Sequence, residues 1–312
     1  MLSSRESNSM SVLVTGATGF IGSRLVSRLV ADGQNVVAIA RNPNNSQISS
    51  NSSVKWLFQD FAETLTFEES LNDITAVVHL AGETLGAGED EGQFLRANEQ
   101  TTVSLAKALG SQVTHFVYAS THAVYGDANN LAVTEDFPLI PTGSAYACSK
   151  LNCENWLRWF QKRNGGQYLS LRFCGFIEGG GLVDYIISQA LCNEQIDLYS
   201  NGVVSRDYLS IDSGIDVIVA ALKYQGNNGF LPINIGSGQV ISALEIANII
   251  CSELESSSKI KLIDKAAPQG DFVFSIERAR DLLNFVPLDL KKAIREYSII
   301  RVKQKLSGQI GA

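Results

Sequence analysis

A tyrosine and a lysine in the segment SAYACSK have types and spacing suited to moving a proton to or from a substrate hydroxyl. Tyr146 and Lys150 are four residues apart, so on a helix they would lie on one face. A phenol has an ordinary pKa of about 10 and is a poor base at neutral pH, but a nearby ammonium favours the phenolate. Lowering that pKa from about 10 to about 7 requires roughly 4 kcal/mol. In isolation such a pair is more often an ordinary pair on a helix surface, so a catalytic interpretation depends on the other motifs in the chain.

A threonine upstream could work beside this pair. In the segment YASTHAVYG, Thr121 follows an apolar run that predicts a strand over 115–120. Sites in α/β proteins form beyond the carboxyl ends of strands, where the hydroxyl of Thr121 could hold a substrate oxygen and relay a proton. Ser120 could do this less directly, and both hydroxyls could instead cap the loop. His122 could contact a substrate, or it could be a loop or pocket-wall residue.

The segment TGATGFIG, which joins a strand predicted over 11–16 to a helix predicted over 20–33, carries three glycines at the spacing GxxGxxG. The first glycine allows a tight turn, the second a close approach of the backbone to a pyrophosphate, and the third close packing of helix and strand. The helix N-terminus supplies N–H donors and positive potential for the phosphates. The segment therefore predicts a nicotinamide-dinucleotide site, whose expected contacts here are Gly16, Thr18, Gly19, Phe20, Ile21 and Gly22. An oxidised nicotinamide would be a second cation that favours the phenolate of Tyr146.

The end of the second predicted strand (35–40) bears on the choice between NAD and NADP. NAD sites usually place a carboxylate there for the ribose 2′-hydroxyl, but this chain has Ala40 followed by Arg41. Arg41 could pair with a 2′-phosphate, which favours NADP over NAD, although it could also be a solvated loop charge or stack on adenine. Asp60 could bond the adenine amino group or cap a turn. The remaining cofactor contacts that we expect are Phe61, Leu80, Ala81, Gly82, Asn98 and Lys150.

Short apolar runs alternate with helical stretches through the first half of the chain. Strands are expected at 11–16, 35–40, 54–60, 76–82, 115–120 and 167–173, and helices at 20–33, 67–73, 91–109 and 144–163. Strands that are apolar throughout indicate a parallel sheet covered on both faces. The fold class is therefore α/β, a doubly wound Rossmann sheet. His79, inside the apolar run VVHLAG, is expected to be a core histidine near the cofactor.

The second half predicts a smaller C-terminal lobe that binds the substrate. The dinucleotide-binding domain is expected to cover 10–173 and to be completed by 211–235, with the lobe made from 174–210 and 236–312. A short strand near 196–199, a helix over 213–224, a strand near 232–235 and three later helices are also expected.

Composition excludes several classes of function for these 312 residues. Hydrophobic residues make up 45% and charged residues 18%, so a sizeable core is expected. The net charge is −7 and no Lys/Arg cluster stands out, which disfavours a nucleic-acid partner. The chain has no apolar run of about 18 residues and its first nine residues lack an apolar signal, so we expect a cytoplasmic protein and no membrane. Five cysteines without CxxC spacing and three histidines indicate reduced thiols and no metal site.

These motifs, in this order, resemble the extended short-chain dehydrogenase/reductase family, of the NAD-dependent epimerase/dehydratase type. The likeness runs from about residue 11 to residue 287. The segments that carry it are TGATGFIG (15–22), HLAG (79–82), RANEQTT with Asn98, STHAVYG (120–126), YACSK (146–150), LRF (171–173), SRDYLSID (205–212), NIGSG (234–238) and Gly-Asp at 270–271.

The resemblance implies roles for individual residues. Thr121, Tyr146 and Lys150 match the family's catalytic Ser/Thr, Tyr and Lys. Asn98 matches an asparagine that braces the region of the lysine. Arg206 matches an arginine that binds the diphosphate of a nucleotide sugar, and guanidinium suits phosphate oxygens; a local ion pair with the neighbouring aspartate is the alternative.

The family also implies a homodimer. Helices near 91–109 and 144–163 would form its interface, with Trp156 or Trp159 on the outer face.

Three departures from the family pattern bear on the substrate. Sugar-nucleotide 4,6-dehydratases carry Asp-Glu after the catalytic threonine, where this chain has His122 and Ala123, so a dehydratase is disfavoured. Gly175 stands where the family usually has an asparagine, and residues 266–269 lack the usual arginine. These differences indicate a divergent substrate pocket.

Three functions remain open at this stage. The leading hypothesis is an NAD(P)-dependent, 4-epimerase-like enzyme acting on a nucleotide-sugar carbinol by tyrosine-assisted hydride transfer. The alternative is an NADPH-dependent carbonyl reductase of a non-nucleotide substrate. A protein that binds NADP as a sensor without turnover is the third.

Overall fold

The computed structural model describes residues 10–45, 53–60, 71, 73–84, 90–126, 128, 130–141, 143–266 and 270–307. The chain divides into two compact units. Unit 1 comprises Met1–Val124, Pro141–Arg172 and Ile218–Pro232, and unit 2 comprises Tyr125–Ile140, Phe173–Val217 and Ile233–Ala312. Residues 125–140, which the sequence places with the dinucleotide-binding domain, thus cluster with unit 2. Within the described part of the chain, no helix is long and apolar enough to span a membrane.

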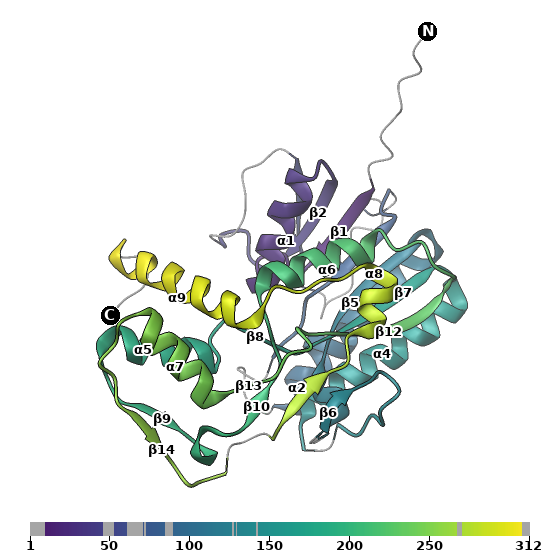
Figure 1. Cartoon of the computed structure of the whole chain (residues 1–312). Helices are drawn as coiled ribbons and strands as arrows, with labels where there is room; N and C mark the ends of the chain where they lie inside the picture. The colour runs from purple at the N-terminus through teal and green to yellow at the C-terminus, as the bar shows by residue number, and fades with distance from the viewer. Residues whose placement is uncertain are drawn as a thin grey trace. The chain divides into compact units, whose positions relative to one another are not determined.

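A seven-stranded sheet with the order β12-β7-β5-β4-β1-β2-β3 organises the fold (Figure 1). Its strands are β1 (Ser11–Thr15), β2 (Asn35–Ala40), β3 (Val54–Phe58), β4 (Ala76–His79), β5 (His115–Thr121), β7 (Gln167–Phe173) and β12 (Gly229–Ile235). Val12 of β1 pairs in parallel with Val36 on one side and Ala76 on the other. The strand order reverses between β1 and β4, and the crevice beyond the carboxyl ends at such a reversal is where α/β proteins bind ligands. The predicted doubly wound α/β sheet is therefore confirmed.

Both faces of this sheet are covered, which explains why its strands are apolar throughout. The helices concerned are α1 (Phe20–Ala31), α3 (Thr101–Leu109), α4 (Ala145–Asn164) and α6 (Ile211–Leu222). On one face, Leu13 of β1 belongs to a buried cluster with residues of α3 and α4, such as Leu105 and Leu157. On the other face, Val12 lies with Leu29 of α1, and Val219 and Leu222 of α6 line the same small hollow.

The long helix predicted over 91–109 is built from three consecutive pieces. They are α2 (Glu91–Phe94), a π-helical stretch over Leu95–Gln100, and α3. Asp90 caps α2 by accepting a hydrogen bond from the backbone N–H of Gln93 at 3.1 Å. Ser144 likewise caps α4, and that helix ends at Asn164, just before Gly165, whose φ is 77°. Apart from residues 71 and 73, the helix predicted over 67–73 lies outside the described residues.

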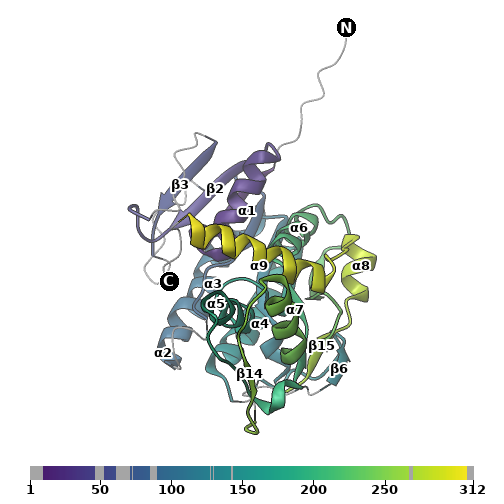
Figure 2. The ribbon, with the colours of Figure 1, turned by 60° about the vertical axis from the view of Figure 1, so that its left-hand side comes forward.

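Unit 2 is held together by three packed helices and several short strand pairs. The helices α5 (Leu182–Cys192), α7 (Ala243–Glu253) and α9 (Leu290–Leu306) bury a shared apolar cluster, and α8 (Glu277–Leu283) precedes α9 (Figure 2). A four-stranded sheet has the order β13 (Ile241–Ser242), β10 (Ser205–Arg206), β15 (Phe272–Phe274) and β6 (Asn130–Val133). The pair β9 (Ile196–Leu198) with β14 (Ile260–Leu262) and the pair β8 (Gly175–Phe176) with β11 (Tyr208–Leu209) complete the strands. A short 3-10 turn of unit 2 occurs at Ser200–Gly202, and two others occur elsewhere in the chain at Gly110–Gln112 and His122–Tyr125.

The strand near 196–199, the strand near 232–235 and the three helices expected after residue 242 are confirmed as β9, β12, α7, α8 and α9. The helix expected over 213–224 is α6.

Candidate functional site

The glycine turn after β1 is too tight for side chains at two of its three glycines. Gly16 has a φ of 65°, and a Cβ there would lie 2.8 Å from the backbone nitrogen of Ala81. A Cβ on Gly22 would lie 2.1 Å from the carbonyl oxygen of Gly16. Gly19 immediately precedes α1, lies exposed, and supplies no side-chain cap to the helix N-terminus. The turn therefore holds the N-terminus of α1 close to the ends of β1 and β4.

A chain of buried hydrogen bonds joins the ends of β1 and β4 to the helical segment behind them. Thr15 lies 2.7 Å from Nδ1 of His79, whose Nε2 lies 2.9 Å from the hydroxyl of Thr102. Thr102 donates to the backbone oxygen of Asn98, so it accepts from Nε2–H, which leaves Nδ1 to accept from Thr15. Burial, and secondarily the charge of Lys150, lowers the pKa of His79 to about 3. His79 is thus a neutral core histidine, as expected, and not an acid or base at neutral pH.

Asn98 braces the loop after β4 against α4. Its Oδ1 accepts from the N–H of Glu83 at 2.8 Å, and its Nδ2 donates to the hydroxyl of Ser149 at 2.8 Å. Ser149 immediately precedes Lys150 and itself donates to the carbonyl of Tyr146. A Cβ on Gly82 would lie 2.6 Å from Asn98 Oδ1, so this approach requires glycine. Asn98 lies in the π-helical stretch, a distortion that is frequent at functional sites.

Thr121 and Tyr146 meet at the carboxyl end of β5. Thr121 is the last residue of β5 and is buried, while the half-buried Tyr146 lies in the first turn of α4. Burial raises the pKa of the Tyr146 phenol above its ordinary value of 10.0, and a hydrogen bond with Thr121 opposes that rise. The groups of the chain alone therefore do not produce the lowered phenol pKa that the sequence led us to expect, because desolvation outweighs them.

Lys150 lies buried under this pair. Its Nζ donates to the carbonyl of Ala119 at 2.9 Å and lies 4.9 Å from the ring centre of Tyr118 and 6.0 Å from that of Tyr146. Burial lowers the pKa of its ammonium, whereas Cys153 and Glu154 raise it. A Cβ on Gly82 would lie 3.6 Å from this ammonium, so the loop after β4 passes close to Lys150.

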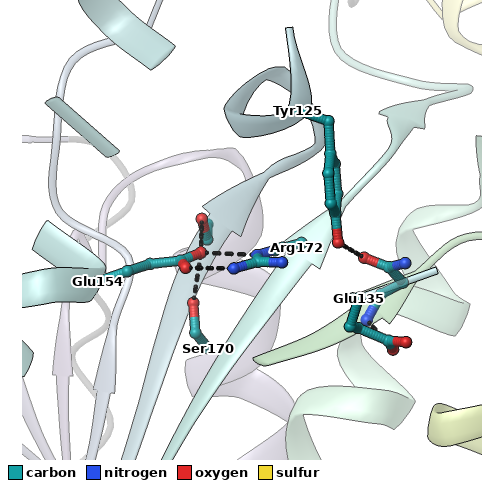
Figure 3. Close-up of polar contacts among 7 residues, drawn as sticks. Tyr125, Glu135, Glu154, Ser170 and Arg172 are labelled. Atoms are coloured by element: carbon teal, nitrogen blue, oxygen red, sulfur yellow. Dashed lines mark hydrogen bonds and ion pairs between the residues drawn. The ribbon is translucent and has the colours of Figure 1, made fainter. Parts of the chain in front are cut away.

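Sequence reasoning missed a buried ion pair one helical turn beyond Lys150. Glu154 and Arg172 are 0% and 1% exposed, and their closest atoms, Oε2 and Nη2, are 2.7 Å apart (Figure 3). Glu154 Oε1 also accepts from the hydroxyls of Ser120 at 2.6 Å and Ser170 at 3.0 Å. The hydroxyl of Ser120, considered as a less direct substrate ligand, is therefore turned towards α4. The signal was present in the sequence, since Lys150 and Glu154 continue the four-residue spacing and Arg172 interrupts an apolar strand.

The predicted adenosine contacts that the structure describes lie just beyond the ends of β2, β3 and β4. The side chain of Arg41 is 71% exposed, and its Nη2 lies 3.5 Å from Oε1 of Glu83. Asp60 follows β3 and is exposed. Leu80 and Ala81 follow β4 beside the glycine turn, where the N–H of Ala81 donates to the hydroxyl of Thr15. Phe61 lies outside the described residues.

The other predicted turn residues surround the N-terminus of α1. Thr18 and Ile21 are half-buried and Phe20 is exposed, with the guanidinium of Arg24 lying 4.5 Å from its ring centre. His122 is half-buried in the turn that follows β5.

Arg206, the predicted diphosphate ligand, belongs to unit 2. Its Nε and Nη2 both donate to the carbonyl of Gly270, at 3.1 and 2.9 Å. The neighbouring Asp207 accepts from the N–H and hydroxyl of Ser237 and from the N–H groups of Gly238 and Phe274. Burial raises the pKa of Asp207 to about 6 although these bonds oppose the rise. Asp207 thus fixes the NIGSG segment, and the two bonds from Arg206 hold the backbone of the Gly-Asp segment.

The position of the missing family asparagine has a local explanation. Gly175 of β8 pairs with Tyr208 of β11, and a Cβ at Gly175 would lie 3.4 Å from the Tyr208 ring. A side chain at position 175 would therefore begin in van der Waals contact with the tyrosine ring.

The residues of unit 1 fit a dinucleotide better than a metal. The glycine turn and the N-terminus of α1, which no side chain caps, place backbone N–H donors and positive potential at the strand reversal, which suits a pyrophosphate. Among the described residues, no group of three or more His, Cys, Asp or Glu side chains could hold a metal ion.

Comparison with known proteins agrees with this geometry. The model of the NAD dependent epimerase/dehydratase family matches residues 12–236. The chain is similar to a UDP-glucose 4-epimerase of Lactobacillus helveticus, with 27% identity covering 89% of this chain and 92% of the relative. It is also similar to a UDP-glucose 4-epimerase of Erwinia amylovora, with 29% identity covering 87% of each chain. Among solved structures, UDP-glucuronic acid 4-epimerase from Bacillus cereus in complex with NAD has a TM-score of 0.80 and 28% identity, covering 93% of this chain and 98% of that one.

Proposed function

This chain belongs to the NAD-dependent epimerase/dehydratase family, and on that premise we propose that it is a 4-epimerase of a nucleotide sugar. Thr121, Tyr146 and Lys150 are its proposed catalytic residues. The observation that carries the proposal is their convergence in unit 1, where the end of β5 meets the first turns of α4. The similarity to UDP-sugar 4-epimerases over nearly the whole chain supports the same conclusion.

In this proposal the chain handles the proton of the substrate carbinol. A bound nicotinamide dinucleotide would supply the hydride acceptor and, in its oxidised form, a positive charge that favours the phenolate. Tyr146 accepts the hydroxyl proton directly or through Thr121, and returns it in the reverse step. Lys150 keeps a positive charge close to the phenol while Ala119 fixes its position.

The choice of cofactor depends on Arg41. The absence of a carboxylate after β2 favours NADP, since Arg41 could pair with a 2′-phosphate. The guanidinium already has a carboxylate partner in Glu83, and that carboxylate would repel a 2′-phosphate. We therefore favour NAD, the cofactor in the Bacillus cereus structure, over the NADP preference that the sequence suggests.

Measured affinities for NAD and NADP test this choice of cofactor. Glu83→Gln should improve binding of NADP relative to NAD, and Arg41→Ala should weaken NADP more than NAD. If Glu83→Gln leaves the ratio of the two affinities unchanged, the pair does not control cofactor choice.

Substrate recognition is proposed for unit 2, which would act as the substrate-binding lobe. Arg206 would bind the diphosphate by turning from the carbonyl of Gly270 or by sharing its N–H groups with it, as guanidinium suits phosphate oxygens. Gly175, which packs beside the ring of Tyr208, would make the sugar side of the proposed site differ from the family pattern.

A homodimer is also proposed. Trp156 and Trp159 on α4 are 44% and 48% exposed and form an edge-to-face pair, which would be covered by a second copy. Light scattering at micromolar concentration that shows only monomers would refute the dimer.

One set of experiments tests the proposed activity. The nucleotide released from the purified, denatured protein is identified, and then UDP-, GDP- and dTDP-sugars are offered in turn. An epimerase converts one of them to its 4-epimer without net loss of cofactor, whereas stoichiometric consumption of added NADPH would establish a carbonyl reductase instead. Tyr146→Phe should lower kcat by about 100-fold or more and leave the fold intact. A wild type that binds dinucleotide but turns over none of these substrates would favour the sensor hypothesis.

A further inference from the structure

Three consecutive residues at the end of β5 each contact a different functional residue of α4. The carbonyl of Ala119 accepts from Lys150, the hydroxyl of Ser120 donates to Glu154, and Thr121 bonds Tyr146. The α4 partners follow one another at four-residue spacing, so they share one face of the helix. Two of these contacts involve proposed catalytic residues, and the third involves the buried carboxylate of Glu154.

Glu154 is a strong anchor because it binds two strands at once. Its carboxylate accepts from Ser120 of β5 and from Ser170 and Arg172 of β7, and all four residues are at most 5% exposed (Figure 3). Bonds to an ionised acceptor are short and are roughly twice as strong as neutral ones. Arg172 balances the charge, so the cluster is neutral as a whole and yet holds Ser120 by a 2.6 Å bond.

We propose that Glu154 is a positioning residue, which acts through Ser120 to set the end of β5 and thereby the placement of Thr121 against Tyr146. The kinetic test of this inference rests on the proposed function, whereas the spectroscopic test does not. Glu154 touches no substrate or cofactor in this role. Its carboxylate also keeps a negative charge one turn away from Lys150, which opposes the effect of burial on that ammonium.

A matched pair of variants separates positioning from simple stabilisation. Ser120→Ala and Ser170→Ala each remove one hydroxyl from the same Oε1 of Glu154, leave the ion pair in place, and differ in the strand that they release. If Glu154 positions the end of β5, Ser120→Ala should lower kcat by about tenfold, equivalent to about 1.4 kcal/mol, with KM within about twofold. Ser170→Ala should leave both constants within about twofold of wild type.

The pH profile gives a readout that a merely structural role would not move. The hydrogen bond with Thr121 lowers the pKa of Tyr146, so loosening it should move the acid limb of the kcat profile to higher pH in Ser120→Ala only. Equal effects of the two variants on kcat and on the acid limb, or no effect of Ser120→Ala, would overturn the proposal.

A spectroscopic test does not require turnover. In the full chain labelled with carbon-13 at threonine methyls and tyrosine Cζ, the Thr121 and Tyr146 signals are assigned with Thr121→Ser and Tyr146→Phe. Ser120→Ala should shift both signals and Ser170→Ala should shift neither. If both signals stay in place in Ser120→Ala, the positioning role is refuted, whereas a wild type without epimerase activity refutes the proposed function alone.

Discussion

Removing the charge of Glu154 should destabilise unit 1 more than any single loss of a hydrogen bond there. Glu154→Gln keeps the shape of the side chain but leaves the guanidinium of Arg172, 1% exposed, without its counter-charge. An unpaired buried charge of this kind costs about 3–5 kcal/mol. Against a total stability of about 5–15 kcal/mol for an ordinary domain, this is a large fraction. For a unit of this size it corresponds to a fall in Tm of roughly 10 °C.

Thermal and urea denaturation of the cofactor-free protein measure the effect. The double variant Glu154→Gln, Arg172→Met removes both charges, so more than half of the lost stability should return, because the desolvation of the ion pair disappears with it. Ser170→Ala serves as the control, with an expected loss of about 1–2 kcal/mol. A single variant within 1 kcal/mol of wild type, or a double variant no more stable than the single, would contradict the reasoning.

Three other predictions concern the glycine turn and two buried titratable groups. Gly22→Ala should weaken dinucleotide binding on the order of tenfold or more, because its Cβ would lie 2.1 Å from a backbone oxygen and α1 would have to move. Gly229→Ala, whose Cβ meets open space, should leave the affinity measured by titration calorimetry unchanged. His79 has a folded pKa of about 3 against an ordinary 6.5, so the unfolded chain takes up its proton first as the pH falls. The free energy of unfolding of unit 1 should therefore fall by about 2 kcal/mol between pH 7 and pH 5. Urea titrations should show a smaller loss in His79→Gln. The effect of Asp207 on stability has the opposite sign, since its folded pKa of about 6 exceeds the ordinary 3.8. The free energy of unfolding of unit 2 should rise by about 1 kcal/mol as the pH falls from 7 to 5, and Asp207→Asn should abolish that gain.

The strands of the large sheet were predictable because their burial on both faces makes them continuous apolar runs. Their ends were less so. The strand predicted over 54–60 ends at Phe58, and the one predicted over 76–82 ends at His79. In the second case the apolar pattern continues into a loop, since the N–H of Leu80 still bonds the carbonyl of Thr15 before the chain turns away. Apolar character reports burial, and burial continues past the last ladder bond.

Unit 2 was predictable in its helices and in the strand near 196–199, but not in its shorter strands. Strands of two or three residues, such as β8, β10 and β13, are too short to show a period of two. The membership of residues 125–140 was also hidden, because it depends on contacts far apart in sequence. Tyr125 donates to Oδ1 of Asn234 (Figure 3). The backbone N–H of Asn234 donates to Glu135, and its Nδ2 donates to the carbonyl of Val133.

The proposed catalytic residues could be found from motif and spacing, but their electrostatics could not. Sequence places Lys150 one turn from Tyr146 and suggests that its charge lowers the pKa of the phenol. The structure shows that burial dominates both groups, raising the pKa of Tyr146 and lowering that of Lys150. Desolvation depends on every neighbour in space, so it becomes visible only when the fold is known.

The arrangement of α4 against β5 separates two kinds of perturbation. Tyr146, Lys150 and Glu154 each depend on one of three successive residues of β5, so a change that shifts α4 disturbs proton chemistry and stability together. The glycine turn is fixed instead by its own tight packing and by the neutral hydrogen bonds of His79. A change there should therefore weaken the dinucleotide while the contacts between β5 and α4 persist. Variants of the turn glycines and of the contacts between β5 and α4 should combine nearly additively in free energy, whereas variants of His79 should not, because Thr102 contacts both His79 and Cys153 of α4.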